Sequence, residues 1–164
     1  MAKYTAAVLT ASDKGAARER EDVSGRLLQE LLLREDFVIL DYAVVPDERE
    51  LISAKLRLLC DELRVNLVLT TGGTGFSPRD ITPEATLDVV ERPAPGIAEA
   101  MRAVSMSITP KAMLSRAAAG IRGRTLIINM PGSPKAVKES FGAIIPALGH
   151  GLDIMTGAAA ECAR

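Results

Sequence analysis

The chain has no tryptophan, and its two tyrosines and three phenylalanines make up only 3% of the residues. So few aromatic rings leave little material for a surface that stacks on nucleic-acid bases. The formal net charge is -1, so no overall charge draws the chain to nucleic acid or to an anionic membrane. We therefore expect neither nucleic acid nor a membrane among its partners.

Cysteine and histidine are also scarce. Cys60 lies in an apolar helical pattern and Cys162 near the C-terminal end, so the pair indicates neither a disulfide framework nor a metal cluster. The one histidine, His150, lies between two glycines and is interpreted as structural rather than as a general base. No apolar run approaches membrane-spanning length and the start lacks the features of a signal peptide, so we expect a cytoplasmic protein.

The 164 residues are 48% hydrophobic and 25% charged, which suits one compact domain over residues 1–164. Strand patterns over 4–10, 37–45 and 65–70 alternate with helical patterns, and this alternation predicts a mostly parallel sheet with helices on both faces. Residues 113–121 and 124–130 flank Arg122-Gly123 and predict a hairpin or a tight connection.

Capping residues predict where the helices begin. Ser24 is a good N-cap, Thr82 is followed by Pro83, and Ser133 is followed by Pro134, as expected at helix starts. The last helical pattern is expected to break or kink at Pro146, and the chain from about 157 onward is expected to fray.

A Gly-rich segment, TTGGTGFSPRD at residues 70–80, follows the third predicted strand and precedes a helix start. It fits neither the P-loop nor the dinucleotide-binding pattern. Glycines let backbone N–H groups converge on a phosphate, and three glycines exceed the needs of a tight turn, so anion binding is favoured. The loops at Ser12-Asp13, Pro46-Asp47 and 131–133 are expected at the same rim, where ligands bind in such folds.

Each candidate has a plainer interpretation. Asp80 could cap a turn or pair with Arg79, and Asp47 has the spacing of an N-cap at a helix start. Because both carboxylates are expected on the phosphate rim, a Mg²⁺ site is the alternative. Lys135, in the first turn of a predicted helix, either binds a phosphate or is a solvated surface lysine. Ser115-Arg116 is either a binding segment or merely an edge of the fold.

Residues 70–75, Arg79-Asp80 and residues 82–85 resemble the signature of the molybdenum cofactor biosynthesis family. Other segments match the family's remaining motifs in order along nearly the whole chain: Ser12-Asp13 with Asp22 and Ser24-Gly25, Pro46-Asp47, residues 114–116, and residues 131–135. Within the family the chain is most similar to the bacterial members that adenylylate molybdopterin. It is also similar to the G domains of plant and animal fusion proteins.

The resemblance implies a three-layer α/β/α sandwich, usually a homotrimer, that transfers AMP from MgATP to the terminal phosphate of molybdopterin and releases pyrophosphate. A partner protein would then insert molybdate. Alternatives are a non-catalytic molybdopterin-binding paralogue, an oligomeric scaffold of the same fold, and an unrelated nucleotide-binding enzyme. Asp47 and Asp80 would be catalytic and position Mg²⁺. The implied substrate-binding residues are Ser12, Asp13, Thr71, Gly72, Gly73, Thr74, Gly75, Ser115, Pro131, Gly132, Ser133 and Lys135, with Ser115, Ser133 and Lys135 on the pterin side.

Overall fold

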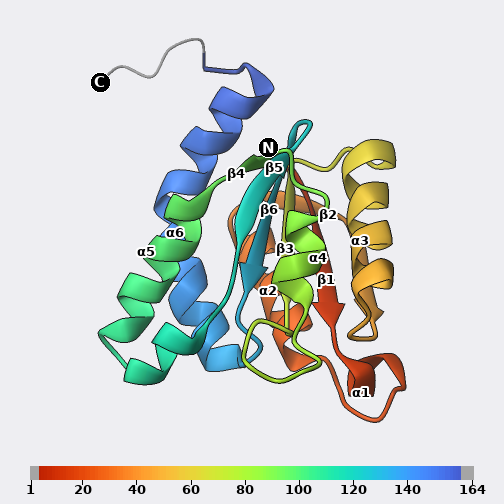
Figure 1. Ribbon diagram of the computed structural model, residues 1–164. Helices are drawn as coiled ribbons and strands as arrows, with labels where there is room; N and C mark the ends of the chain where they lie inside the picture. Colours follow the sequence, from red (N-terminus) through yellow and green to blue (C-terminus); the bar gives the residue numbers. More distant parts are fainter. Residues whose placement is uncertain (1–3, 160–164) are drawn as a thin grey trace.

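The computed structural model describes residues 4–159. Strands and helices alternate along the chain, as Figure 1 shows. The strands are β1 (Tyr4–Ala11), β2 (Phe37–Val45), β3 (Leu67–Thr71), β4 (Arg92–Pro93), β5 (Ala119–Arg122) and β6 (Thr125–Met130). The helices are α1 (Asp13–Ala16), α2 (Val23–Arg34), α3 (Arg49–Arg57), α4 (Thr82–Leu87), α5 (Pro95–Met106) and α6 (Pro134–Thr156), with a π-helical turn η1 (Leu58–Glu62) and a 3₁₀ turn η2 (Pro110–Leu114).

The strands form one six-stranded sheet in the order β2-β1-β3-β6-β5-β4. β1 pairs in parallel with β2 and β3, and β3 pairs in parallel with β6. β5 runs antiparallel to both β6 and β4. The sheet is therefore mostly parallel, as predicted, and the expected hairpin is the β5–β6 pair around Arg122 and Gly123.

Helices cover both faces of this sheet, and the strand residues alternate between the two sides. Ala6 and Val8 of β1 pack in one core with α2, α5 and α6, whereas Ala7 and Leu9 pack in the other with α3, η1 and α4. Because both faces are buried, all four side chains are apolar and none is exposed. The predicted three-layer α/β/α sandwich is confirmed.

The chain leaves β1 toward β2 on one side, then crosses back to β3 on the other side of β1. This reversal makes a switch point between the carboxyl ends of β1 and β3, where open α/β sheets bind ligands. In Figure 1 these ends point to the lower edge of the sheet, beside α1. Among the helices of the described chain, none combines the length and the apolar character needed to cross a membrane.

Two of the three predicted helix caps are wrong. The N-cap of α2 is Asp22, not Ser24, and its carboxylate accepts a hydrogen bond from the Gly25 amide at 2.9 Å. Asp22 takes this position because it also accepts hydrogen bonds from the hydroxyls of Thr10 at 2.6 Å and Tyr42 at 2.5 Å. Ile81 precedes α4, and Thr82 is already inside that helix.

The C-terminal predictions have mixed outcomes. Ser133 does cap α6, accepting a hydrogen bond from the Ala136 amide at 3.3 Å. α6 does not break at Pro146 but continues to Thr156, and Gly157 ends it in the left-handed conformation at φ 77°. The predicted fraying beyond residue 159, like Cys162, lies outside the described residues.

Candidate functional site

A cavity of about 480 Å³ opens at the switch point. Its walls come from the loops after β1, β2, β3 and β6, so the four loops predicted to share a rim do meet there. Asp13 flanks the cavity and is held against Asp47 by hydrogen bonds. The predicted site residues that line the cavity are Ser12, Asp47, Thr71, Gly72, Gly73, Asp80 and Gly132.

The backbone itself requires two of the glycines in the loop after β3. Gly72 has φ 89°, and a Cβ there would lie 2.3 Å from the carbonyl oxygen of Ala11. Gly73 has φ 68°, and a Cβ there would lie 2.3 Å from Thr82 Oγ1. Turn geometry and close approach therefore already explain both glycines. The number of glycines alone no longer favours anion binding, which stays a prediction.

Arg116 holds this loop in place, a role that the sequence did not reveal. Its amide donates to the carbonyl of Thr74 at 2.8 Å, and its guanidinium donates to the carbonyls of Gly75 at 2.8 Å and Asp80 at 2.5 Å. It also forms an ion pair with Glu84 of α4. Thr74 and Gly75 thus face Arg116 through their backbone, and Arg116 is an anchor of the loop.

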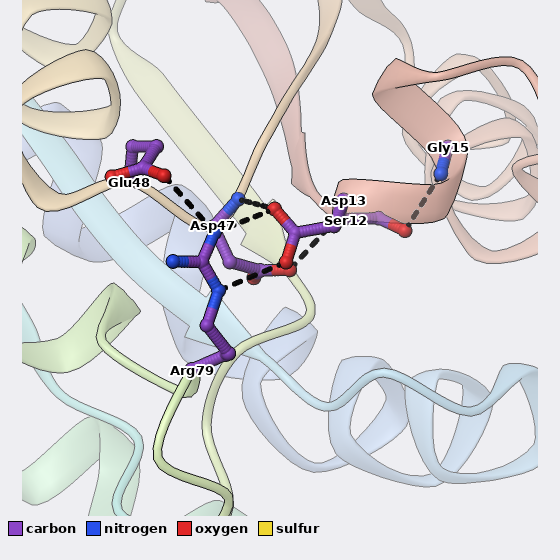
Figure 2. Close-up of polar contacts among 6 residues, drawn as sticks. All are labelled: Ser12, Asp13, Gly15, Asp47, Glu48 and Arg79. Carbon is purple, nitrogen blue, oxygen red and sulfur yellow. Dashed lines mark hydrogen bonds and ion pairs between the residues drawn. The ribbon is translucent and has the colours of Figure 1, made fainter.

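Asp47 is not the N-cap of α3. That position belongs to Glu48, whose side chain makes no capping hydrogen bond. Asp47 Oδ2 instead accepts a hydrogen bond from the Asp13 amide at 2.9 Å, and the Asp47 amide donates to Asp13 Oδ1 at 3.0 Å (Figure 2). The capping interpretation of Asp47 is therefore wrong, and its carboxylate belongs to the rim.

Asp80 caps a turn, as one interpretation predicted, and does not pair with Arg79, as the other did. Its Oδ2 accepts a hydrogen bond from the Ser77 amide at 3.0 Å, while Arg79 pairs with Asp13 and Glu48. Burial raises the pKa of the Asp47 carboxyl, and the negative charges of Asp13 and Asp80 act in the same direction. The two predicted catalytic residues therefore line one cavity, and the negative charge of Asp80 disfavours ionisation of Asp47.

A buried hydroxyl lies beside them. Thr82 is fully buried, and its Oγ1 has no hydrogen-bond partner. The position where a Gly73 Cβ would be is 2.3 Å from this oxygen and 3.4 Å from Asp47 Oδ1. A buried hydroxyl without a partner is costly, and Thr82 itself is not among the residues that line the cavity.

The carboxylates do not form a metal cage by themselves. Within residues 4–159, no three His, Cys, Asp or Glu side chains are grouped so that they could hold a metal ion. Asp47 and Asp80 can supply one or two oxygens, which is the share that proteins usually contribute when Mg²⁺ is also held by substrate phosphates. The donor set therefore fits a metal that is bound together with a nucleotide.

Two other predicted residues line a different space. Ser115 and Pro131 line a second hollow of about 230 Å³, next to Arg102 and Lys111. Because Pro131 faces the second hollow and Gly132 the first, the loop after β6 separates the two spaces.

Three predicted residues lie at helix starts. Ser12 and Ser133 cap α1 and α6 with their hydroxyls. Lys135 is exposed in the first turn of α6. The two serines thus have a structural role, whatever they contact in a complex.

Several wall residues were not predicted as site residues. Thr10, Arg20, Glu21, Asp22, Val23 and Ser24 also line the first cavity, and Ser24 Oγ donates to the carbonyl of Gly132 at 2.7 Å. The resemblance had included Asp22 and Ser24 in its first loop, which was the available signal. Arg20 adds a cation to a wall that otherwise presents carboxylates.

Known proteins are similar to this chain in both sequence and fold. Residues 7–150 match the family described as "Probable molybdopterin binding domain". The molybdopterin adenylyltransferase of Helicobacter pylori (strain J99) is 46% identical over 152 residues, covering 92% of this chain and 86% of the relative. Gephyrin of Dictyostelium discoideum is 50% identical over 118 residues, covering 72% of this chain and 16% of the relative.

Solved structures agree with this match. The molybdopterin biosynthesis enzyme MoaB from Thermus thermophilus superposes with a TM-score of 0.90 at 48% identity, covering 94% of this chain and 98% of that one. Sequence and fold thus agree over nearly the whole length. The chain belongs to the molybdopterin-binding domain family of molybdenum cofactor biosynthesis.

Proposed function

We propose that the protein is a molybdopterin adenylyltransferase, which transfers AMP from ATP to the terminal phosphate of molybdopterin. A phosphate oxygen of the pterin attacks the α-phosphorus of ATP, a new P–O–P bond forms, and pyrophosphate leaves. The observation that carries the proposal is the pair Asp47 and Asp80 in one cavity with the backbone of Gly72 and Gly73. The identity to adenylyltransferases over 92% of the chain supports it.

The chemistry suits the residues present. Transfer at phosphorus needs positioning and charge neutralisation more than a nucleophilic side chain. Asp47 and Asp80 would hold Mg²⁺ that arrives with the nucleotide, and this ion would supply the neutralising charge. The backbone amides of Gly72 and Gly73, which line the cavity, would provide donors for phosphate oxygens.

The two hollows suggest how two ligands are divided. We assign the nucleotide and its phosphates to the 480 Å³ cavity with the two aspartates. The pterin would reach the 230 Å³ hollow, where Ser115 lies beside the cationic side chains of Arg102 and Lys111. Lys135 and Ser133, at the start of α6, would complete the pterin side.

An exposed apolar surface supports the homotrimer that belongs to the same proposal. Five apolar side chains are exposed along the second half of α5, the turn after it and η2: Val104, Met106, Ile108, Met113 and Leu114. A cluster of exposed apolar side chains marks an interaction surface. Sedimentation equilibrium of the pure protein measures the assembly, and a monomer at micromolar concentration would contradict this part of the proposal. Location in the cytoplasm and a molybdate-inserting partner protein are further parts of it.

One assay tests the activity. The protein is incubated with molybdopterin, ATP and Mg²⁺, and adenylylated molybdopterin is separated from its precursor. We expect product with the wild type and none with Asp80→Asn or with Asp47→Asn, while both variants keep the circular dichroism spectrum of the folded protein. Bound pterin without product in the wild type would favour the non-catalytic paralogue.

A further inference from the structure

Arg79, next to Asp80 in the loop after β3, joins three rim loops (Figure 2). Its Nε donates to Asp13 Oδ2 at 3.0 Å, and its terminal nitrogen NH2 donates to Asp13 Oδ1 at 2.8 Å and to Glu48 Oε1 at 3.0 Å. Asp13 follows β1 and Glu48 follows β2. One guanidinium therefore connects the ends of three neighbouring parallel strands.

Asp13 passes this connection on to Asp47. Its Oδ1 accepts hydrogen bonds from Arg79 and from the Asp47 amide at 3.0 Å, and its own amide donates to Asp47 Oδ2 at 2.9 Å. Both oxygens of Asp13 are thus engaged inside the protein, which fits a supporting role better than a direct contact with substrate. We call Arg79, Asp13, Glu48 and Asp47 the Arg79 clamp.

The charges explain why a cation is needed at this place. Asp13, Asp47 and Glu48 bring three carboxylates to one side of the cavity, and the charge of Asp80 also acts on Asp47. Arg79 brings a positive charge to these carboxylates and donates to both oxygens of Asp13. The guanidinium offsets the repulsion between the carboxylates of Asp13 and Asp47, whose loops are also joined by the hydrogen bond from the Ser12 amide to the Val45 carbonyl at 2.9 Å.

The clamp has little to contribute to global stability. The side chains of Arg79, Asp13 and Glu48 are 53%, 44% and 53% exposed. Exposed ion pairs contribute about 0–1 kcal/mol to folding. A two-pronged contact between a guanidinium and a carboxylate nevertheless fixes geometry, because both planar groups must align.

We propose that Arg79 is a positioning residue for the adenylyl transfer, acting through Asp13 to hold the Asp47 carboxylate and, through the chain, its neighbour Asp80. The inference rests on the proposed function. It assigns the acidic Asp13 to the support of Asp47, in place of the substrate contact that the family resemblance implied.

The informative variant is Arg79→Lys, which keeps the charge and loses the two-pronged contact. We expect kcat to fall about tenfold to a hundredfold, because small displacements of reacting groups slow the chemical step by such factors. The KM for ATP should stay within about threefold of the wild-type value, and the melting temperature should be nearly unchanged. The matched control is Arg122→Lys, because Arg122 makes the same kind of contact with Asp61, at 3.0 and 2.7 Å, at a place outside the cavity. Its kcat should equal that of the wild type.

Two outcomes would overturn the inference. If Arg79 binds the triphosphate directly, Arg79→Lys raises KM for ATP with kcat little changed. If Arg79 does not act through Asp13, the losses of kcat in Arg79→Lys and Asp13→Asn multiply in the double variant. Action through Asp13 predicts that the double variant is no worse than the less active of the two single ones.

A readout without turnover separates this inference from the proposed function. Exchange of the Asp47 amide hydrogen, followed by NMR, reports its hydrogen bond to Asp13. We expect faster exchange in Arg79→Lys and an unchanged rate in Arg122→Lys. Unchanged exchange in Arg79→Lys overturns the clamp, whereas a wild type that forms no adenylylated pterin overturns the proposed function.

Discussion

Replacing Gly72 by alanine tests the geometry at the centre of the site. Gly72 has φ 89°, a conformation that residues with a Cβ rarely adopt, and the new Cβ would lie 2.3 Å from the Ala11 carbonyl oxygen. That oxygen belongs to the backbone of β1, so it cannot move aside as the end of a flexible side chain could. Either the loop or the strand must shift.

The cost can be worked out from these two terms. The left-handed conformation costs about 1–2 kcal/mol for a residue with a Cβ, and forcing extra volume into a packed place typically costs about 1–3 kcal/mol. The two together give roughly 3 kcal/mol. For a chain of this length, that loss lowers the melting temperature by about 6–12 °C.

Gly123 is the matched control. It also has a positive φ, 56°, but a Cβ there meets nothing within 4 Å. Gly123→Ala should therefore lose only the conformational term, about 1–2 kcal/mol. Both variants and the wild type are compared by thermal unfolding followed by circular dichroism. Equal losses in the two variants, or no loss in Gly72→Ala, would refute the close approach of β1 to the loop.

Two further predictions concern titratable groups. Burial and neighbouring charges raise the pKa of Asp47 in the folded state, so ionisation of this carboxyl lowers the stability of the fold at pH values above its pKa in the unfolded state. Asp47→Asn should therefore melt at the wild-type temperature or higher at pH 7. This gain should vanish at a pH low enough to protonate Asp47 in both the folded and the unfolded protein. Burial raises the pKa of the Cys60 thiol to about 11, so in a Cys162→Ser background Cys60 should react with iodoacetamide at pH 8 only after denaturation. A lower melting temperature for Asp47→Asn, or rapid labelling of native Cys60, would contradict the respective environment.

The rim of the site could be predicted because it depends on sheet geometry. Once β1, β2, β3 and β6 are taken as parallel, the loops that follow them must meet at one edge, whatever their side chains contact. The placement of Asp47 and Asp80 at this edge follows directly, since each lies in a loop that follows a strand end. The same reasoning placed Gly72 and Gly73 at the rim.

Side-chain partners could not be predicted in this way. Asp22 and Ser24 are both good N-caps, and the hydroxyls of Thr10 and Tyr42, which lie on other elements, decide for Asp22. Arg116 reaches the loop after β3 from 36 residues beyond Asp80. Local sequence carries no signal for such contacts, because they depend on how the finished strands and helices face each other.

Transfer of label from ATP to the pterin tests the central claim most directly. Wild-type protein is incubated with molybdopterin, Mg²⁺ and ATP labelled at either the α- or the γ-phosphate, and the pterin product is isolated. The account predicts that the α-label alone enters the pterin, together with one pyrophosphate released per product. Label from the γ-phosphate in the pterin, or bound pterin that never acquires label, would contradict it.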